Sequence, residues 1–67
     1  MYNNLKAELV RIGKNQGCLA ELLGITEKQV SFKFNGLSDF RITEAIKIRD
    51  TLFPNLTLDY LFKKTKN

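Results

Sequence analysis

Two short helical segments separated by a glycine-containing turn constrain the fold of this chain more than any other feature of its sequence. Asn15 precedes the first segment, where its side chain can cap the backbone N–H groups of a helix start. Thr26 precedes the second segment and Gln29 follows three residues later, which is the spacing of a capping box. Gly24 stands where the first helix must end, at a position that commonly requires positive φ. The sequence therefore predicts two helices joined by a tight turn over residues 16–35, a helix-turn-helix unit.

The second of these helices has two different sides. At about 100° per residue, Val30 and Phe34 share one side, which we expect to face the core. The outward side carries a cation, a hydroxyl, an aromatic ring and an amide: Lys28, Ser31, Phe32 and Asn35. Glu27 lies at the edge between the two sides. A surface of this composition can read base edges in a major groove, whereas an ordinary solvent-exposed helix face is the alternative that the pattern leaves open.

Length, charge and the missing residue types narrow the possible functions. With 67 residues there is room for one domain, and 43% hydrophobic residues are typical of a folded chain. The net charge of +4 favours a polyanionic partner when it occurs beside paired helices of this kind. Cys18 is the single cysteine and there is no histidine, so we expect no disulfide, no metal site and no cofactor.

Neither a membrane span nor a signal peptide is indicated by the sequence. No apolar run approaches the ~20 residues that cross a bilayer, and the first ten residues lack a charged-then-apolar layout. We therefore expect a cytoplasmic protein with no membrane partner. We also expect no small-molecule ligand, because no second module is present to sense one.

Apolar spacing predicts another helix before the paired segments. Leu5, Leu9 and Ile12 recur at i, i+4 and i+7, which indicates a helix over residues 5–12 with this face in the core. Two neighbouring asparagines can cap its start, namely Asn3 and Asn4.

Two more helices are expected after the paired segments. A broad apolar stripe predicts a helix over residues 42–53, which Pro54 ends. The stripe that we expect to face the core consists of Ile42, Ala45, Ile46, Ile48, Leu52 and Phe53. Arg49 falls inside the stripe and must either extend to solvent or find a carboxylate. Thr57 can cap a last short helix over residues 58–62.

These segments together predict an all-α, compact five-helix bundle with a helix-turn-helix. Residues 1–62 form its single domain. Phe40 is expected to plug the apolar space beneath the loop after the second paired helix. Residues 63–67 (KKTKN) are expected to be a basic flexible tail, which either touches phosphates or keeps the protein soluble.

The chain resembles the phage repressor/Cro-type helix-turn-helix proteins, in particular small phage-encoded regulators from Gram-positive hosts. The resemblance covers residues 2–62 and is carried by LAELLGIT, the NG pair after the second paired helix, EAIKI and LFPNLTLDYLF. It implies a DNA-binding regulator of transcription, such as a repressor. The helix over residues 27–35 would enter the major groove of double-stranded operator DNA, and the protein would bind as a homodimer.

The resemblance also implies roles for individual residues. The base-reading positions are held by Glu27, Lys28, Ser31 and Phe32. The phosphate-binding positions are held by Gln16, Lys33, Asn35 and the Gly36 amide. Residues 55–62 carry more apolar groups than a short terminal helix needs for one core, so we expect a dimer interface among Leu56, Leu58, Leu61 and Phe62.

Three positions depart from the family pattern. Lys14 replaces an apolar residue, which leaves the end of the first helix either looser or closer to phosphate. Arg41 stands where a threonine usually caps the fourth helix. Phe34 replaces a glutamate that pairs with an arginine in some members, so packing must replace that ion pair.

Two other classes of function compete with DNA binding. A protein-interaction module, such as an antirepressor or antitoxin acting on a partner regulator, would use the same exposed Phe32 and Glu27. An enzyme would need catalytic groups close together, and the sequence indicates none. Three glutamates are expected on the solvated faces of separate helices: Glu8, Glu21 and Glu44.

Overall fold

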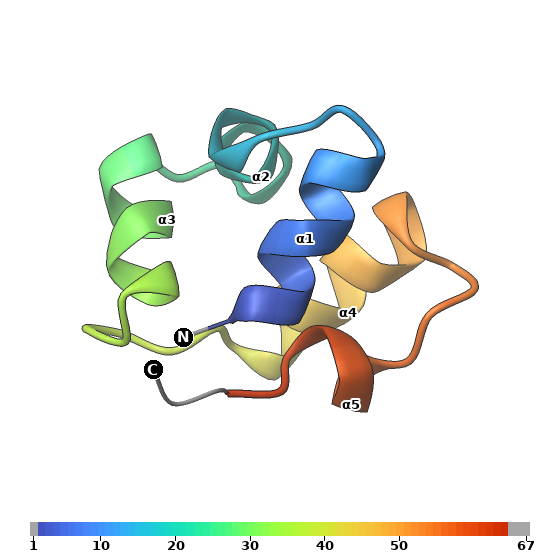
Figure 1. The fold of residues 1–67 in the computed structure, drawn as a ribbon. Coiled ribbons are helices and arrows are strands. Elements are labelled where there is room, and N and C mark those ends of the chain that lie inside the picture. Colours follow the sequence, from blue (N-terminus) through green and yellow to red (C-terminus); the bar gives the residue numbers. More distant parts are fainter. Residues whose placement is uncertain (1, 65–67) are drawn as a thin grey trace.

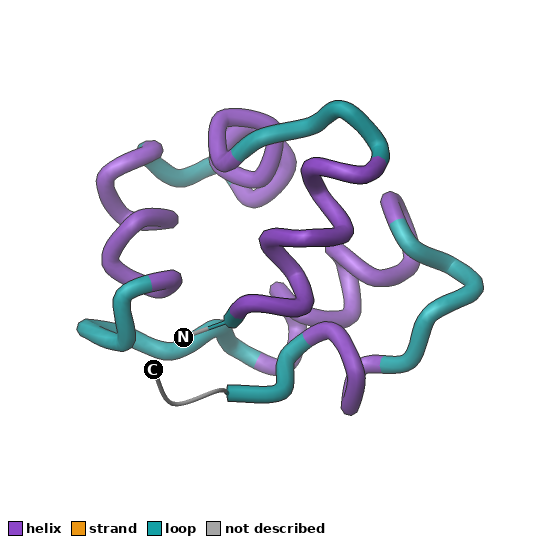
Figure 2. Tube along the Cα trace, in the orientation of Figure 1, coloured by secondary structure: helices purple, strands orange, loops and turns teal. Residues whose placement is uncertain are grey.

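Five helices make up the fold of residues 2–64, the described part of this computed structural model (Figure 1). They are α1 (Asn3–Arg11), α2 (Gln16–Leu23), α3 (Glu27–Phe34), α4 (Ile42–Leu52) and α5 (Leu58–Leu61). Residues 2–64 contain helices and loops but no strand, which confirms the all-α prediction (Figure 2). None of these helices combines the length and the apolar character that a membrane span requires.

The core lies between the five helices, each of which contributes a buried side chain. α2 packs on both α3 and α4, while α5 packs on α1 and α4. The side chains with the least exposure come from all five helices: Leu5, Leu19, Val30, Ile48 and Leu61. Because α3 contributes only one side to this core, the rest of its surface is left for other contacts.

The turn between α2 and α3 is built as the sequence predicts. Asn15 caps α2 by accepting the Cys18 N–H at 3.2 Å. Gly24 ends α2 in the left-handed conformation, with φ +70°, which a side chain would strain. Thr26 Oγ1 accepts the Gln29 N–H at 3.1 Å, and Gln29 Oε1 accepts the Thr26 N–H at 2.9 Å. The predicted capping box is confirmed.

The start and the end of α1 differ from the prediction. Tyr2 is the N-cap residue and makes no side-chain cap, so neither Asn3 nor Asn4 has the predicted capping role. Asn4 instead donates from Nδ2 to the Tyr60 carbonyl at 2.8 Å, which ties α1 to α5. Ile12 is 41% exposed because the helix ends at Arg11 and the apolar face does not continue.

A carboxylate on α1 is also buried, contrary to the expected solvated face. Glu8 is 7% exposed and accepts a hydrogen bond from the Tyr60 hydroxyl at 2.8 Å. Its other oxygen lies 3.3 Å from Arg11 Nε. These two partners satisfy the carboxylate, which explains why it is tolerated beside the core.

The apolar stripe of α4 is narrower than predicted. Ala45 and Ile48 are buried, but Ile42 is 69% and Ile46 is 39% exposed. These two isoleucines therefore lie outside the core. Arg49 finds its carboxylate in the next residue of the chain, since its Nε lies 2.6 Å from Asp50 Oδ1.

The N-terminus of α4 is capped by only one half of a capping box. Glu44 Oε1 accepts the Arg41 N–H at 2.8 Å. The Arg41 side chain has no acceptor atom, so it cannot return a bond to the helix as a threonine would. The Phe53 backbone follows α4 at the expected end, before Pro54.

Four aromatic rings fill the space between α3, the α3–α4 loop and both ends of the chain. Phe40 lies 5.1 Å from Tyr2, 5.7 Å from Phe34 and 5.4 Å from Phe62 between ring centroids, each in an edge-to-face arrangement. The prediction that Phe40 plugs the loop is confirmed. Phe34 is therefore held by ring packing.

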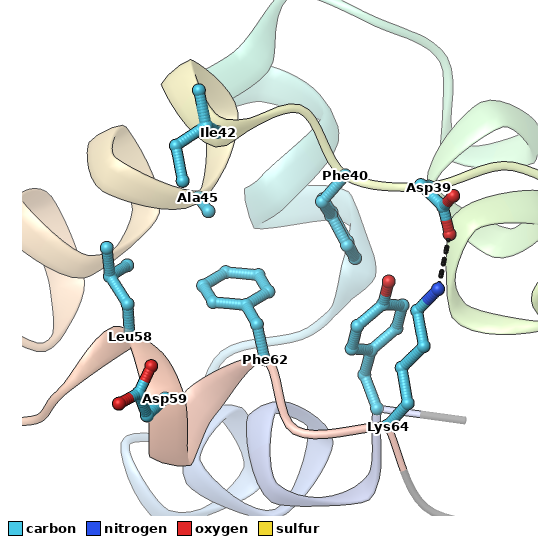
Figure 3. Close-up of a pocket in the computed structure, with 9 residues that line it drawn as sticks. Asp39, Phe40, Ile42, Ala45, Leu58, Asp59, Phe62 and Lys64 are labelled. Atoms are coloured by element: carbon cyan, nitrogen blue, oxygen red, sulfur yellow. Dashed lines mark hydrogen bonds and ion pairs between the residues drawn. The ribbon is translucent and has the colours of Figure 1, made fainter.

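The end of the described chain returns to this loop. Thr57 caps α5 by accepting the Tyr60 N–H at 3.1 Å, as predicted. Beyond α5, Lys64 Nζ lies 2.8 Å from Asp39 Oδ1 (Figure 3). This hydrogen bond lowers the pKa of the Asp39 carboxyl and raises the pKa of the Lys64 ammonium group. The rest of the predicted tail, residues 65–67, lies outside the described residues.

Candidate nucleic-acid interface

One face of α3 points away from the rest of the molecule, and α3 itself stands at the edge of the bundle (Figure 1). Val30 and Phe34 are 0% and 6% exposed and hold the inner side against the core. Lys28 and Phe32 are exposed on the outer side. The predicted division of α3 into two sides is therefore confirmed, and Phe32 lies outside the core as expected.

Lys28 and Phe32 form a pair on this outer face. The ammonium nitrogen of Lys28 lies 5.7 Å from the centroid of the Phe32 ring, within the range of a cation–π contact. Phe32 is 39% exposed, so one part of the ring is free for a further contact. Ser31 is half-buried beside them.

Glu27 lies at the opposite end of α3, close to the start of α2. A Cβ atom added to Gly17 would lie 3.4 Å from Glu27 Oε1 and 3.1 Å from Asn15 Oδ1. The carboxylate thus lies beside the first turn of α2, where backbone N–H groups and the helix dipole favour negative charge. A phosphate approaching this turn would meet the charge of Glu27.

The predicted phosphate-binding positions differ in what they can offer. Gln16 begins α2 and is half-buried, whereas Asn35 is exposed at the end of α3. The Gly36 N–H donates to the Lys33 carbonyl at 3.3 Å and is therefore already used inside the turn. Gln16 and the Asn35 side chain are consequently better placed for a backbone contact than the Gly36 amide.

Lys33 is a correction to the predicted set, because its side chain is folded into the protein. Only 13% of this side chain is exposed, and Nζ lies 3.3 Å from Glu44 Oε1. The same nitrogen donates to the Asp39 carbonyl at 3.0 Å and lies 5.8 Å from the Phe40 ring centroid. Its charge is satisfied within the chain, so the side chain is not free for a phosphate contact in this structure.

An open groove beside Phe32 was not anticipated from the sequence. It has a volume of about 520 Å³ and is lined by side chains of α3, the α3–α4 loop and the start of α4: Ile25, Gln29, Phe32, Lys33, Ser38, Arg41, Thr43 and Glu44. Arg41 is exposed there and forms no ion pair with any of residues 2–64. No local spacing marks this groove, because the loop conformation creates it.

Two free cations also lie near the start of α2. Lys6 and Lys14 line a small pocket together with Gln16, and both are exposed without an ion-pair partner in the described part of the chain. The Lys14 N–H donates to the Leu9 carbonyl at 2.8 Å. The end of α1 is therefore closed by a backbone hydrogen bond.

The predicted dimer surface loses one residue. Leu61 is 0% exposed and belongs to the core, so a second copy cannot contact it. Leu56, Leu58 and Phe62 are half-buried. Leu58 and Phe62 line an open groove of about 520 Å³ between α4 and α5, where the exposed Ile42 also lies (Figure 3).

No group of three or more histidine, cysteine, aspartate or glutamate side chains among residues 2–64 is arranged to hold a metal ion. Searches of protein-family models, curated proteins and solved structures found no match to this chain.

Proposed function

We propose that this chain is a sequence-specific DNA-binding regulator of transcription, with α2 and α3 forming a helix-turn-helix and α3 entering the major groove. The observation that carries the proposal is the orientation of α3, whose polar and aromatic side is free while Val30 and Phe34 fix the other side to the core. The net charge of +4 supports it, since cations near the groove would release counterions from DNA.

The free side chains of α3 have the chemistry that base reading requires. Lys28 can donate to O6 and N7 of guanine, and the exposed part of Phe32 can lie against a thymine methyl group. Glu27 can accept from N4 of cytosine. Its place beside the first turn of α2 gives it a second use, because its charge opposes phosphate in an incorrect register.

A dimer would bring two copies of α3 to one face of the duplex. Leu56, Leu58 and Phe62 supply the apolar surface for it, and half-sites should then lie about one helical turn, ~34 Å, apart. Occupancy of an operator would then rise with the concentration of the protein.

The test is selection of bound sites from random duplex DNA by the full chain. We expect a recurring sequence motif and a binding constant that falls steeply with salt on the selected duplex. A bound pool with no enriched motif, or an affinity that does not respond to salt, would contradict the proposal.

A protein-interaction module is the second candidate, and one observation favours it. Leu37 is 73% exposed, and its N–H donates to the carbonyl of the exposed Phe32 at 2.9 Å, so two exposed apolar residues adjoin at the end of α3. Such a pair of apolar residues could bind the surface of a partner regulator, as in an antirepressor or antitoxin. Salt-independent binding to a regulator, without DNA binding, would favour this candidate.

A further inference from the structure

We propose that Lys33 and Glu44 are positioning residues: their ion pair fixes the C-terminal end of α3 against the start of α4 and so sets how α3 meets DNA. The part of this inference that concerns DNA rests on the proposed function. The tie between the two helices does not depend on it and can be tested without DNA.

The two ends of α3 are held in different ways. The N-terminal end is fixed by the capping box and by the short turn from α2, which packs along α3. Among the described helices, α2 is the one whose backbone lies closely against α3. Side chains must therefore hold the C-terminal end of α3 in place, near Phe32 and Asn35.

The Lys33–Glu44 pair is built for this task. Both side chains are largely covered, with 13% and 18% exposure, and their charged atoms lie 3.3 Å apart. Reduced contact with water strengthens their attraction relative to that of a surface pair. Each partner is also anchored locally, because Lys33 donates to the Asp39 carbonyl and Glu44 accepts the Arg41 N–H.

These bonds enclose the whole α3–α4 loop. Lys33 comes from the last turn of α3, Asp39 lies within the loop, and Glu44 lies in the first turn of α4. A rotation of α3 about its N-terminal turn would break the contacts of Lys33 with both of the others. The pair therefore restricts the motion that would most change the placement of the base-reading side chains.

If Lys33 instead contacts phosphate, one substitution should change the affinity for DNA in the opposite direction. Glu44→Gln keeps an oxygen for the Arg41 N–H but removes the charge that holds Lys33. If Lys33 positions α3, this change weakens binding to the selected duplex. If Lys33 contacts phosphate, the same change frees a cation, removes an anion and strengthens binding to every duplex.

The experiment is a double-mutant cycle with Lys33→Gln, Glu44→Gln and both together, measured by duplex titration and by thermal melting. We expect each single variant to lose roughly 3- to 10-fold in affinity for the selected duplex and much less for random duplex, with no further loss in the double variant. Lys33→Arg should retain most of the affinity. Lys47→Gln and Glu21→Gln are matched controls, because both residues are exposed and form no ion pair with any of residues 2–64.

Three outcomes decide the matter. Tighter binding of Glu44→Gln on both duplexes, with a steeper salt dependence, overturns the positioning role in favour of a phosphate contact. The tie between α3 and α4 is overturned if the affinity losses of the two single variants multiply in the double variant, or if their changes in melting temperature simply add. Failure of the unmodified chain to select any duplex would overturn the proposed function, while a coupled melting cycle would still support the tie between α3 and α4.

Discussion

The hydroxyl of Tyr60 on α5 donates to Oε2 of the buried Glu8 on α1 at 2.8 Å, across 52 positions of the chain. This bond raises the pKa of Tyr60 above its ordinary value of 10.0, because ionising the phenol would lose a hydrogen bond and place a second negative charge beside the carboxylate. The short helix α5 is therefore held to the bundle by a group that responds to alkaline pH.

The first prediction concerns the stability of the fold at alkaline pH. A folded-state pKa raised above the unfolded value means that the contribution of Tyr60 is fully present below about pH 10, the unfolded pKa, and is lost as pH rises through the folded pKa. Tyr60→Phe should lower the melting temperature near neutral pH, and the difference from the unmodified chain should shrink above pH 10. Melts across this range test it; a pH-independent difference would contradict the linkage.

The capping box gives a second prediction. Thr26→Ala removes the acceptor of the Gln29 N–H and should destabilise the fold by about 1 kcal/mol. The free energy of unfolding from urea titrations measures the loss. Thr51→Ala is the control, since Thr51 is exposed within α4 and caps no helix. Equal effects of the two substitutions would mean that the cap contributes nothing.

A third prediction separates base reading from backbone contact. Lys28→Ala and Phe32→Ala should each cost about 1–3 kcal/mol on the selected duplex and much less on random duplex, apart from one phosphate's worth of charge for Lys28. Their melting temperatures should change little, because neither side chain belongs to the core. Equal losses on both duplexes would instead assign the two residues to the DNA backbone.

The fourth prediction distinguishes the core of α5 from its surface. Leu61→Ala should lower the free energy of unfolding by roughly 2–5 kcal/mol, since this side chain is fully buried.

Leu58→Glu places a charge on the half-buried groove side of α5 and should weaken dimer formation on DNA. Analytical ultracentrifugation with duplex DNA measures the stoichiometry. Two copies of Leu58→Glu per duplex, bound with unchanged affinity, would show that this surface does not form the dimer.

Local hydrogen bonding explains why much of the fold could be predicted. Asn15, Thr26 and Thr57 each accept an N–H three residues later, and Gly24 ends α2 through its own backbone freedom. Such interactions are complete within one helical turn, so their residue types and spacing are sufficient to identify them. The two sides of α3 follow from the same helical period.

The sequence by itself determined the five helices, the caps of α2, α3 and α5, and the side of α3 that is free. Only the tertiary structure decided which charges are satisfied internally and which apolar groups are covered. Glu8 looks like a solvated residue and Lys33 like a phosphate contact until Tyr60 and Glu44 are brought beside them. Ile42 looks buried until α4 is placed. The physical reason is that a helical period fixes direction around one axis, whereas burial and ion pairing depend on what the other helices place there.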